Sequence, residues 1–161
     1  MTEMVSAVNV RLLADVPQVI PTLAEWYKQE WHAWFADMPL AEIEADFQRA
    51  ANRDRLPFAV VALDHETKPI GVCSIRDEAF APYPDAGPWL KGLYVVPAQR
   101  GRGIAGELIR TAAAHAGTLG VIKAYAATHS AIGTFERAGW LGFDQVRHEQ
   151  QMLTVFAKRL A

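Results

Sequence analysis

The sequence has few of the features that mark secreted, membrane-spanning or nucleic-acid-binding proteins. It has one cysteine, Cys73, so no disulfide can form within the chain. No apolar run approaches the length of about 18 residues that a membrane-spanning helix needs. The net charge is −2, so no overall positive field favours nucleic acid. The N-terminus has no basic segment followed by an apolar run, as a secretory signal would. We therefore expect a cytoplasmic protein that binds neither a membrane nor nucleic acid.

The remaining composition is that of an ordinary globular protein. Of the 161 residues, 51% are hydrophobic and 21% are charged, which is enough to form a sizeable core. We predict a single domain over residues 1–161, without internal repeats or low-complexity segments. Cys73 lies in an apolar alternating run, so we expect a buried free thiol rather than a nucleophile.

The spacing of apolar residues predicts both strands and helices. Strand patterns occur at residues 8–13, 58–63, 70–76, 89–96, 121–128, 142–147 and 152–158. Helical spacing occurs at residues 16–34, 40–52, 104–116 and 131–138. Pro21 could instead mark the beginning of the first helix. Residues 79–88 are rich in proline and glycine, and they predict an exposed, stiff loop that could rim an active site.

The order of these elements predicts the class of fold. The strand before residue 97, the helix after it and the strand after residue 120 favour a parallel pair. Hairpins link the strands around that pair. We therefore predict an α/β fold with a mixed, mostly antiparallel sheet, one parallel pair and flanking helices.

The stretch Leu93–Gly106 combines a strand, a glycine-rich turn and the beginning of a helix. Its sequence is Leu-Tyr-Val-Val-Pro-Ala-Gln-Arg-Gly-Arg-Gly-Ile-Ala-Gly. The unpaired N–H groups and the dipole of the helix N-terminus favour an anion there. Gly101 and Gly103 let a ligand approach the backbone closely. The adjacent arginines add positive charge. The stretch is therefore predicted to bind an anionic group.

Two common phosphate-binding patterns do not account for this stretch. It is not a Walker A loop, because no Gly-Lys-Ser/Thr follows. Gly106 falls where a dinucleotide fingerprint needs its third glycine, but the stretch lies in mid-chain and no acid occurs near Ala124.

The same stretch resembles the acyl-CoA loop of the GNAT superfamily of N-acetyltransferases. That family's pattern, Gln/Arg-x-x-Gly-x-Gly/Ala, is met by Arg100, Gly103 and Ala105, and the Val-x-Pro entry is met by Val95 and Pro97. The element order is similar to the GNAT fold over nearly the whole chain. The resemblance implies acetyl-CoA as co-substrate and no metal. The cofactor-binding residues expected are Leu93, Tyr94, Val95, Arg100, Gly101, Arg102, Gly103, Ile104, Ala105, Gly106 and Phe135.

The resemblance also implies how the thioester is activated. In the family, the strand before the loop diverges from its neighbour and offers a backbone N–H to the thioester carbonyl. In this chain the resemblance places the donor in residues 93–95, where a fixed N–H would stabilise the negative charge that develops on the thioester oxygen. The free strand edge would pair with the pantetheine arm.

The second motif of the family, Asn-x-x-Ala-x-x-x-Tyr-x-x-x-Gly-Phe, is met only in part. Ala131 and Gly139 match, whereas Thr128 stands for the asparagine and Trp140 for the phenylalanine. Phe135 replaces the tyrosine that often serves as general acid. Because Phe135 has no proton to give, a proton donor must come from elsewhere or the thiolate must leave unassisted.

Candidate catalytic groups lie outside the two motifs. We name Glu30, on an aromatic helix end, and Asp77, after the strand at residues 70–76, as the catalytic candidates. Glu78, Asp85 and His129 stay open as alternatives.

The aromatic helix end supplies the candidates for binding the acceptor. Trp31 and Trp34 are predicted to line an acceptor pocket, because aromatic rings beside an acid suit a cationic guest. Packing of these rings in the core is the alternative.

We expect an N-acetyltransferase, an acyltransferase that moves an acetyl group from acetyl-CoA to a primary amine. The acceptor would be a small molecule or a peptide. Two alternatives stay open, a non-catalytic acyl-CoA-binding regulatory module and a nucleotide-binding regulatory domain. The two C-terminal strands could pair between subunits, so a homodimer is also open.

Overall fold

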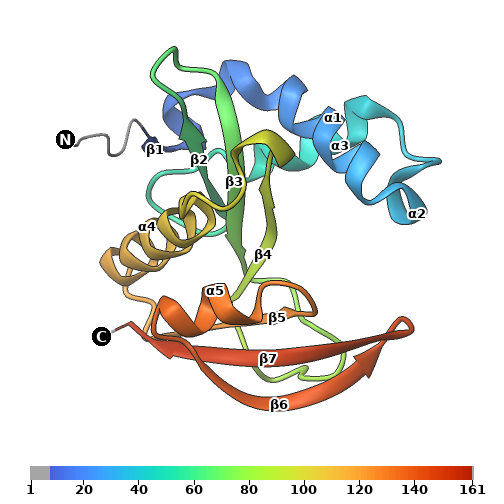
Figure 1. Cartoon of the computed structure of the whole chain (residues 1–161), viewed down its shortest axis with the longest axis vertical. Coiled ribbons are helices and arrows are strands. Elements are labelled where there is room, and N and C mark those ends of the chain that lie inside the picture. Colours follow the sequence, from blue (N-terminus) through green and yellow to red (C-terminus); the bar gives the residue numbers. More distant parts are fainter. Residues whose placement is uncertain (1–7, 161) are drawn as a thin grey trace.

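The computed structural model describes residues 8–160, and residues 1–7 and 161 of the predicted domain lie outside the described residues. In this described part of the chain, seven strands form one sheet in the order β1-β2-β3-β4-β5-β7-β6 (Figure 1). The strands are β1 (Asn9–Leu12), β2 (Phe58–Leu63), β3 (Pro69–Arg76), β4 (Trp89–Val95), β5 (Lys123–Thr128), β6 (Leu141–His148) and β7 (Gln151–Arg159). Among the strands of residues 8–160, only the β4–β5 pair is parallel, and the other pairs are antiparallel. The predicted mixed sheet is confirmed.

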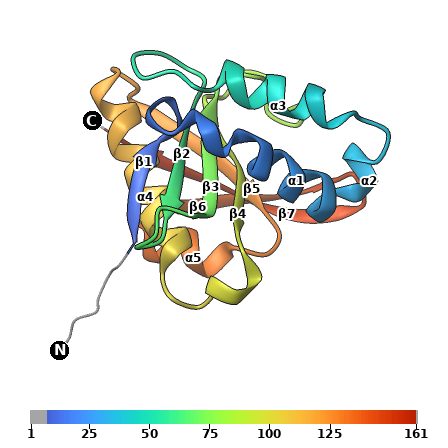
Figure 2. The same ribbon diagram turned by 90° about the horizontal axis from the view of Figure 1, so that it is seen from above.

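Helices cover both faces of this sheet. The α-helices are α1 (Ile20–Glu30), α2 (His32–Phe35), α3 (Leu40–Arg49), α4 (Ile104–Thr118) and α5 (Ile132–Arg137). Short 3-10 helices occur at Leu13–Asp15, Pro17–Val19 and Pro97–Gln99. Figure 2 shows α1 and α3 on one side of the strands and α5 on the other. Within residues 8–160, no helix is long and apolar enough to cross a membrane.

The prediction of one continuous helix over residues 16–34 is wrong. A 3-10 turn comes first, and α1 begins at Ile20 with Pro21 in its first turn, where a missing N–H does no harm. Trp31 then leaves the helical conformation, with φ −112° and ψ 51°. Its ring packs edge-on against Tyr27, with centroids 4.8 Å apart, and also faces Tyr94 of β4. The break thus accompanies contacts with a strand that is distant in the sequence.

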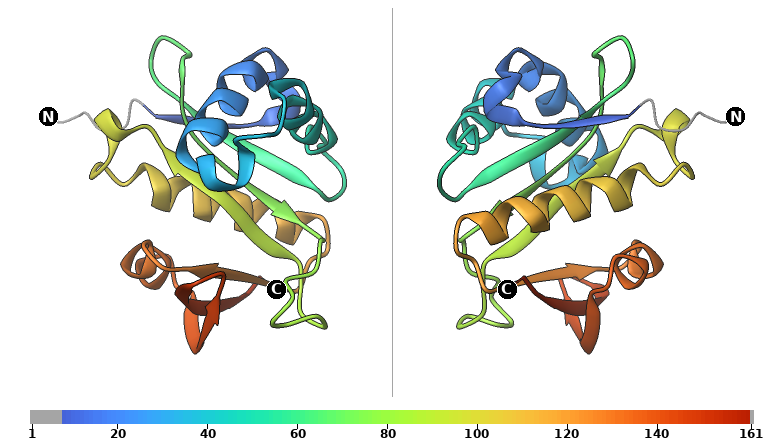
Figure 3. Two further views of the ribbon diagram at one scale, coloured as in Figure 1. Left: turned by 90° about the vertical axis from the view of Figure 1, so that its right-hand side faces the viewer. Right: turned by 90° about the vertical axis from the view of Figure 1, so that its left-hand side faces the viewer.

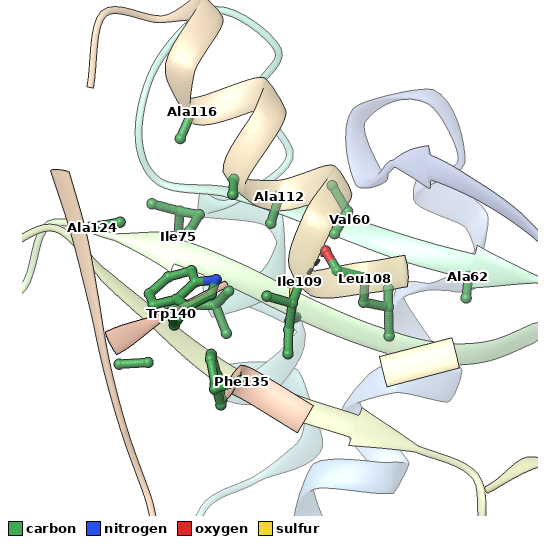
Figure 4. Packing of buried hydrophobic residues seen from close by; sticks show 14 of the residues in the cluster. Val60, Ala62, Ile75, Leu108, Ile109, Ala112, Ala116, Ala124, Phe135 and Trp140 are labelled. Atoms are coloured by element: carbon green, nitrogen blue, oxygen red, sulfur yellow. Dashed lines mark hydrogen bonds between the residues drawn. The ribbon is translucent and has the colours of Figure 1, made fainter. Parts of the chain in front are cut away.

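Alternate residues of the central strands enter two hydrophobic cores. Val61 and Val72 point toward α1 and α3, while Val60 and Ile75 point toward α4. Figure 4 shows the second core, in which α4 presents its apolar side chains to the strands. Cys73 lies in this core and is fully buried, as predicted. Burial raises the pKa of its thiol, so it stays neutral.

The loop at residues 79–88 is held against the C-terminal hairpin. Phe80 packs edge-on against Trp89 of β4 and His148 of β6, with ring centroids 4.9 and 5.0 Å apart. Tyr83 packs against Phe143 of β6 at 5.8 Å. The prediction of a loop without a helix or strand holds, but aromatic contacts with β6 anchor it.

Candidate active site

β4 and β5 are paired only near one end of β4. Their parallel ladder joins Trp89 to Tyr125 and Leu90 to Ala126. Within residues 8–160 no further pair extends this ladder, although β4 continues to Val95. Figure 3 shows β4 running away from the C-terminal strands. An extended ligand could therefore pair with the free edge of β4, as a neighbouring strand would.

A β-bulge occurs in β4 just after the two strands separate. The register of β4 on β3 shifts by one residue between Val72 and Ser74, so both Gly92 and Leu93 lie opposite Cys73. Gly92 has a φ of 69°, in the left-handed region that favours glycine. The bulge turns the backbone out of the regular strand pattern where the free edge begins.

Tyr27 of α1 holds the bulge from the side that carries α1 and α3. Its hydroxyl donates a 2.6 Å hydrogen bond to the carbonyl oxygen of Gly92. A Cβ on Gly92 would lie 2.1 Å from that hydroxyl oxygen, so a side chain cannot be added there without displacing Tyr27. Burial raises the pKa of Tyr27, and the positive charge of Arg76 offsets part of this rise. The hydroxyl is therefore a neutral donor.

The loop after β4 leads into α4 without a side-chain cap. The N-cap residue is Gly103, with a φ of 83°, and Gly101 has a φ of 80°. A Cβ built on either glycine would meet no atom within 4 Å. The first N–H groups of an α-helix have no partner inside the helix. Open space, bare N–H groups and the helix dipole together could hold a phosphate.

Arg100 bends back along β4. Its Nε donates a 2.8 Å hydrogen bond to the carbonyl oxygen of Val95, and its guanidinium lies 5.5 Å from the centre of the Tyr94 ring. Arg102 is exposed. Arg100 thus joins the glycine-rich loop to Val95 and Tyr94 of β4.

A comparison with protein-family models identifies the family of this chain. The model of the acetyltransferase (GNAT) family matches residues 20–140, more than half of the chain. The protein belongs to the GNAT acetyltransferase family. The resemblance inferred from Arg100, Gly103 and Ala105 is therefore confirmed.

Solved acetyltransferase structures share this fold at low sequence identity. An aminoglycoside 6'-acetyltransferase type Ii is 18% identical, with a TM-score of 0.72, and the alignment covers 95% of this chain and 97% of that one. An aminoglycoside 6'-N-acetyltransferase complexed with coenzyme A is 15% identical, with a TM-score of 0.75 and coverage of 95% and 97%. A dodecameric spermidine N-acetyltransferase from Vibrio cholerae is 18% identical, with a TM-score of 0.69 and coverage of 97% and 95%. No curated protein matches the chain.

The second GNAT motif forms α5 and the turn before it. The Thr128 hydroxyl accepts a 3.0 Å hydrogen bond from the Ala131 N–H and so closes this turn. Phe135 is 2% exposed and stacks on Phe156, with ring centroids 5.4 Å apart. Figure 4 shows Phe135 close to Trp140, at a centroid distance of 5.2 Å. The residue at the family's tyrosine position is therefore packed mainly in the core.

The aromatic residues predicted to bind the acceptor lie in different surroundings. Trp31 is half-buried and faces Tyr94, with ring centroids 6.3 Å apart. Trp26, which was not among the residues predicted to bind the acceptor, lies closer to Tyr94, with ring centroids 5.3 Å apart. Trp34 is 62% exposed and Glu30 is exposed. The structure thus brings Trp31, but not the exposed Trp34, against the second half of β4.

Charged residues gather where β3 ends and β4 begins. Asp77 is exposed directly after β3. Arg76 is buried and contacts Asp46 of α3 at 3.0 Å and Glu78 at 3.6 Å. Glu78 also lies 3.8 Å from Lys91, the residue before the bulge. Of the carboxylates considered from the sequence, Glu78 therefore contacts β4 directly.

Gly92 and Tyr27 were not among the site residues predicted from the sequence. An isolated glycine inside the strand pattern of residues 89–96 was an available signal, since such a glycine often marks a bulge. Tyr27 gave no comparable signal, because its partner lies 65 residues away in the sequence.

Proposed function

We propose that the protein is an N-acetyltransferase that moves the acetyl group of acetyl-CoA to a primary amine of a small molecule or peptide. The observation that carries this proposal is the separation of β4 from β5 after Leu90, which leaves a free strand edge that leads toward the uncapped glycine loop before α4. The free strand edge suits the amide groups of a pantetheine arm, and the loop suits a pyrophosphate. The related aminoglycoside enzyme complexed with coenzyme A supports this choice of co-substrate.

Each part of this site would have its own task. The backbone N–H groups at Gly103 and the first turn of α4 would bind the pyrophosphate, with Arg102 adding positive charge. Residues 91–95 would align the pantetheine arm. The N–H of Leu93, in the bulge, would donate to the thioester oxygen as negative charge develops on it. Acetyl-CoA would supply the activated thioester.

The acceptor would lie on the aromatic side of β4. Trp31 and Trp34 would contact it, and the carboxylate of Glu30 would attract a cationic amine. Glu30 or Asp77 would take the proton that the amine loses when its nitrogen attacks the carbonyl carbon. The bond from carbon to sulfur then breaks. Because Phe135 has no hydroxyl, the thiolate would leave without a proton from that position.

The experiment combines binding with turnover. Calorimetry should show that acetyl-CoA binds, and a panel of amines should contain acceptors that release free CoA thiol from it. The panel should include amino sugars, amino acids, polyamines and peptide N-termini. Binding without turnover on any amine would favour the non-catalytic module. Binding of nucleotides without the pantetheine arm, in preference to acetyl-CoA, would favour a nucleotide-binding regulatory domain.

The assembly and location of the protein are also proposals. Leu141, Phe143 and Met152 of the C-terminal hairpin are all at least 47% exposed, and such apolar exposure supports pairing of two copies through this hairpin. Light scattering at several concentrations tests the homodimer. A cytoplasmic location is supported by the fully buried, unpaired Cys73, since thiols persist in reducing compartments.

A further inference from the structure

The contact between Tyr27 and Gly92 joins two parts of the site that carry different tasks. Tyr27 belongs to α1, which also carries Trp26 and Glu30 on the acceptor side. Gly92 belongs to the bulge at which β4 begins to offer its free edge. The hydrogen bond of 2.6 Å between them spans 65 residues of sequence. A helix on the acceptor side thus holds the backbone that the proposed function assigns to the thioester.

The direction of the Leu93 N–H follows from this contact. Within residues 8–160 the cis peptide bonds precede Pro57 and Pro88, so the Gly92–Leu93 peptide is trans. In a planar trans peptide, the C=O and the N–H point in opposite directions. Because Tyr27 holds the Gly92 oxygen toward α1, the Leu93 N–H points away from α1.

Tyr27 can hold this peptide firmly because its own ring is enclosed. The residue is 9% exposed. Its ring packs against Trp31 and Phe47, each at a centroid distance of 4.8 Å, and against Phe35 at 6.2 Å. A side chain locked on three sides loses little further freedom when its hydroxyl bonds to a partner. Packing of the ring therefore fixes the position of the hydroxyl before a ligand binds.

We propose that Tyr27 is a positioning residue, whose hydroxyl orients and polarises the Gly92–Leu93 peptide so that the Leu93 N–H donates to the thioester oxygen. This inference rests on the proposed function. A hydrogen bond accepted by a peptide carbonyl strengthens the N–H of the same peptide as a donor. Tyr27 acts through this backbone group and needs no contact with the thioester. A wholly structural role would stabilise the fold and leave the thioester carbonyl unchanged.

The test uses a signal that needs no acceptor. Acetyl-CoA labelled with ¹³C at the acetyl carbonyl is bound to the protein, and infrared difference spectra report the carbonyl stretch. Polarisation by an N–H lowers this frequency in the wild type. Tyr27→Phe keeps the ring and removes the hydroxyl, so the frequency should move back toward that of free acetyl-CoA. The affinity measured by calorimetry should stay within about threefold, because one neutral hydrogen bond contributes little.

Turnover gives the second measurement. With an acceptor found in the amine panel, Tyr27→Phe should lower kcat by roughly three- to tenfold and leave the KM for acetyl-CoA nearly unchanged. Tyr83→Phe is the matched control, since the Tyr83 hydroxyl donates to Asp144 of β6 in the anchored loop. It should change neither the carbonyl frequency nor kcat.

A fluorinated tyrosine at position 27 distinguishes an effect of the hydroxyl from an effect of the shape of the ring. Its more acidic hydroxyl is a stronger donor, so the carbonyl frequency should fall below that of the wild type. Unchanged frequencies in both Tyr27 variants, in proteins that bind acetyl-CoA normally, would overturn the role of Tyr27 and leave the proposed function intact. Failure of the wild type to bind acetyl-CoA would overturn both.

Discussion

Substitution of Gly103 by aspartate tests the phosphate-binding role of the loop most directly. Gly103 is the N-cap of α4 and has open space around its Cβ direction, so the new carboxylate would meet no neighbouring atom, although the φ of 83° adds a conformational cost. It would stand where the helix N-terminus attracts an anion. Two like charges about 5 Å apart in water repel by about 0.8 kcal/mol. Two phosphate charges near the carboxylate therefore cost about 1.7 kcal/mol.

This penalty should weaken acetyl-CoA binding by at least tenfold, since about 1.4 kcal/mol corresponds to a factor of ten in Kd. Gly103→Asn is nearly the same size and carries no charge, so it should fall between the wild type and the aspartate variant. The difference between the two variants should shrink as salt is added, because exposed charges are screened over about 10 Å at 0.1 M. Calorimetry at two salt concentrations measures both effects.

Gly120 provides a matched control for the backbone. It has a φ of 90°, and a Cβ there would also meet no atom within 4 Å. It follows the far end of α4, which has 15 residues and is therefore about 22 Å long. Gly120→Asp should carry a similar conformational cost and bind acetyl-CoA like the wild type. A folded Gly103→Asp protein with unchanged affinity would refute the assignment of the loop to phosphate.

Three further predictions concern the acceptor side, the tyrosine position and the buried thiol. Trp31→Ala should raise the KM of an acceptor and lower stability, whereas Trp34→Ala, at an exposed ring, should raise only the KM; unchanged acceptor kinetics in both would place the acceptor elsewhere. Phe135→Tyr should lower the free energy of unfolding in urea by about 1–3 kcal/mol, because its hydroxyl would be buried against Phe156 without a partner; full stability with higher kcat would show that the hydroxyl reaches the leaving thiolate. The unfolded Cys73 thiol ionises as the pH passes its ordinary pKa of 9.0, while the folded thiol, whose pKa is raised by burial, ionises only at higher pH. Stability from this group is therefore complete below pH 9 and falls above it by about 1.4 kcal/mol per pH unit, a slope that Cys73→Ala should reduce between pH 9 and 10 in urea titrations.

Elements with a strong local pattern could be predicted closely from the sequence. The predicted strand at residues 58–63 is β2, Phe58–Leu63, because an unbroken apolar run bounded by turn residues suits a strand buried on both faces. The helix after the glycine turn begins at Ile104, as its apolar spacing predicted, and extends two residues further, to Thr118. The end of the first helix could not be predicted from local spacing. The helix breaks at Trp31, whose ring contacts Tyr27 and also Tyr94 of β4, a strand that is distant in the sequence.

The family could be recognised from the sequence alone, because the pattern around Arg100, Gly103 and Ala105 depends on local backbone freedom and charge. Only the tertiary structure showed where β4 leaves β5, since a sheet edge is defined by a partner strand and not by the strand's own residues. It alone also placed Tyr27 against Gly92, because a contact across 65 residues depends on how α1 packs against the sheet.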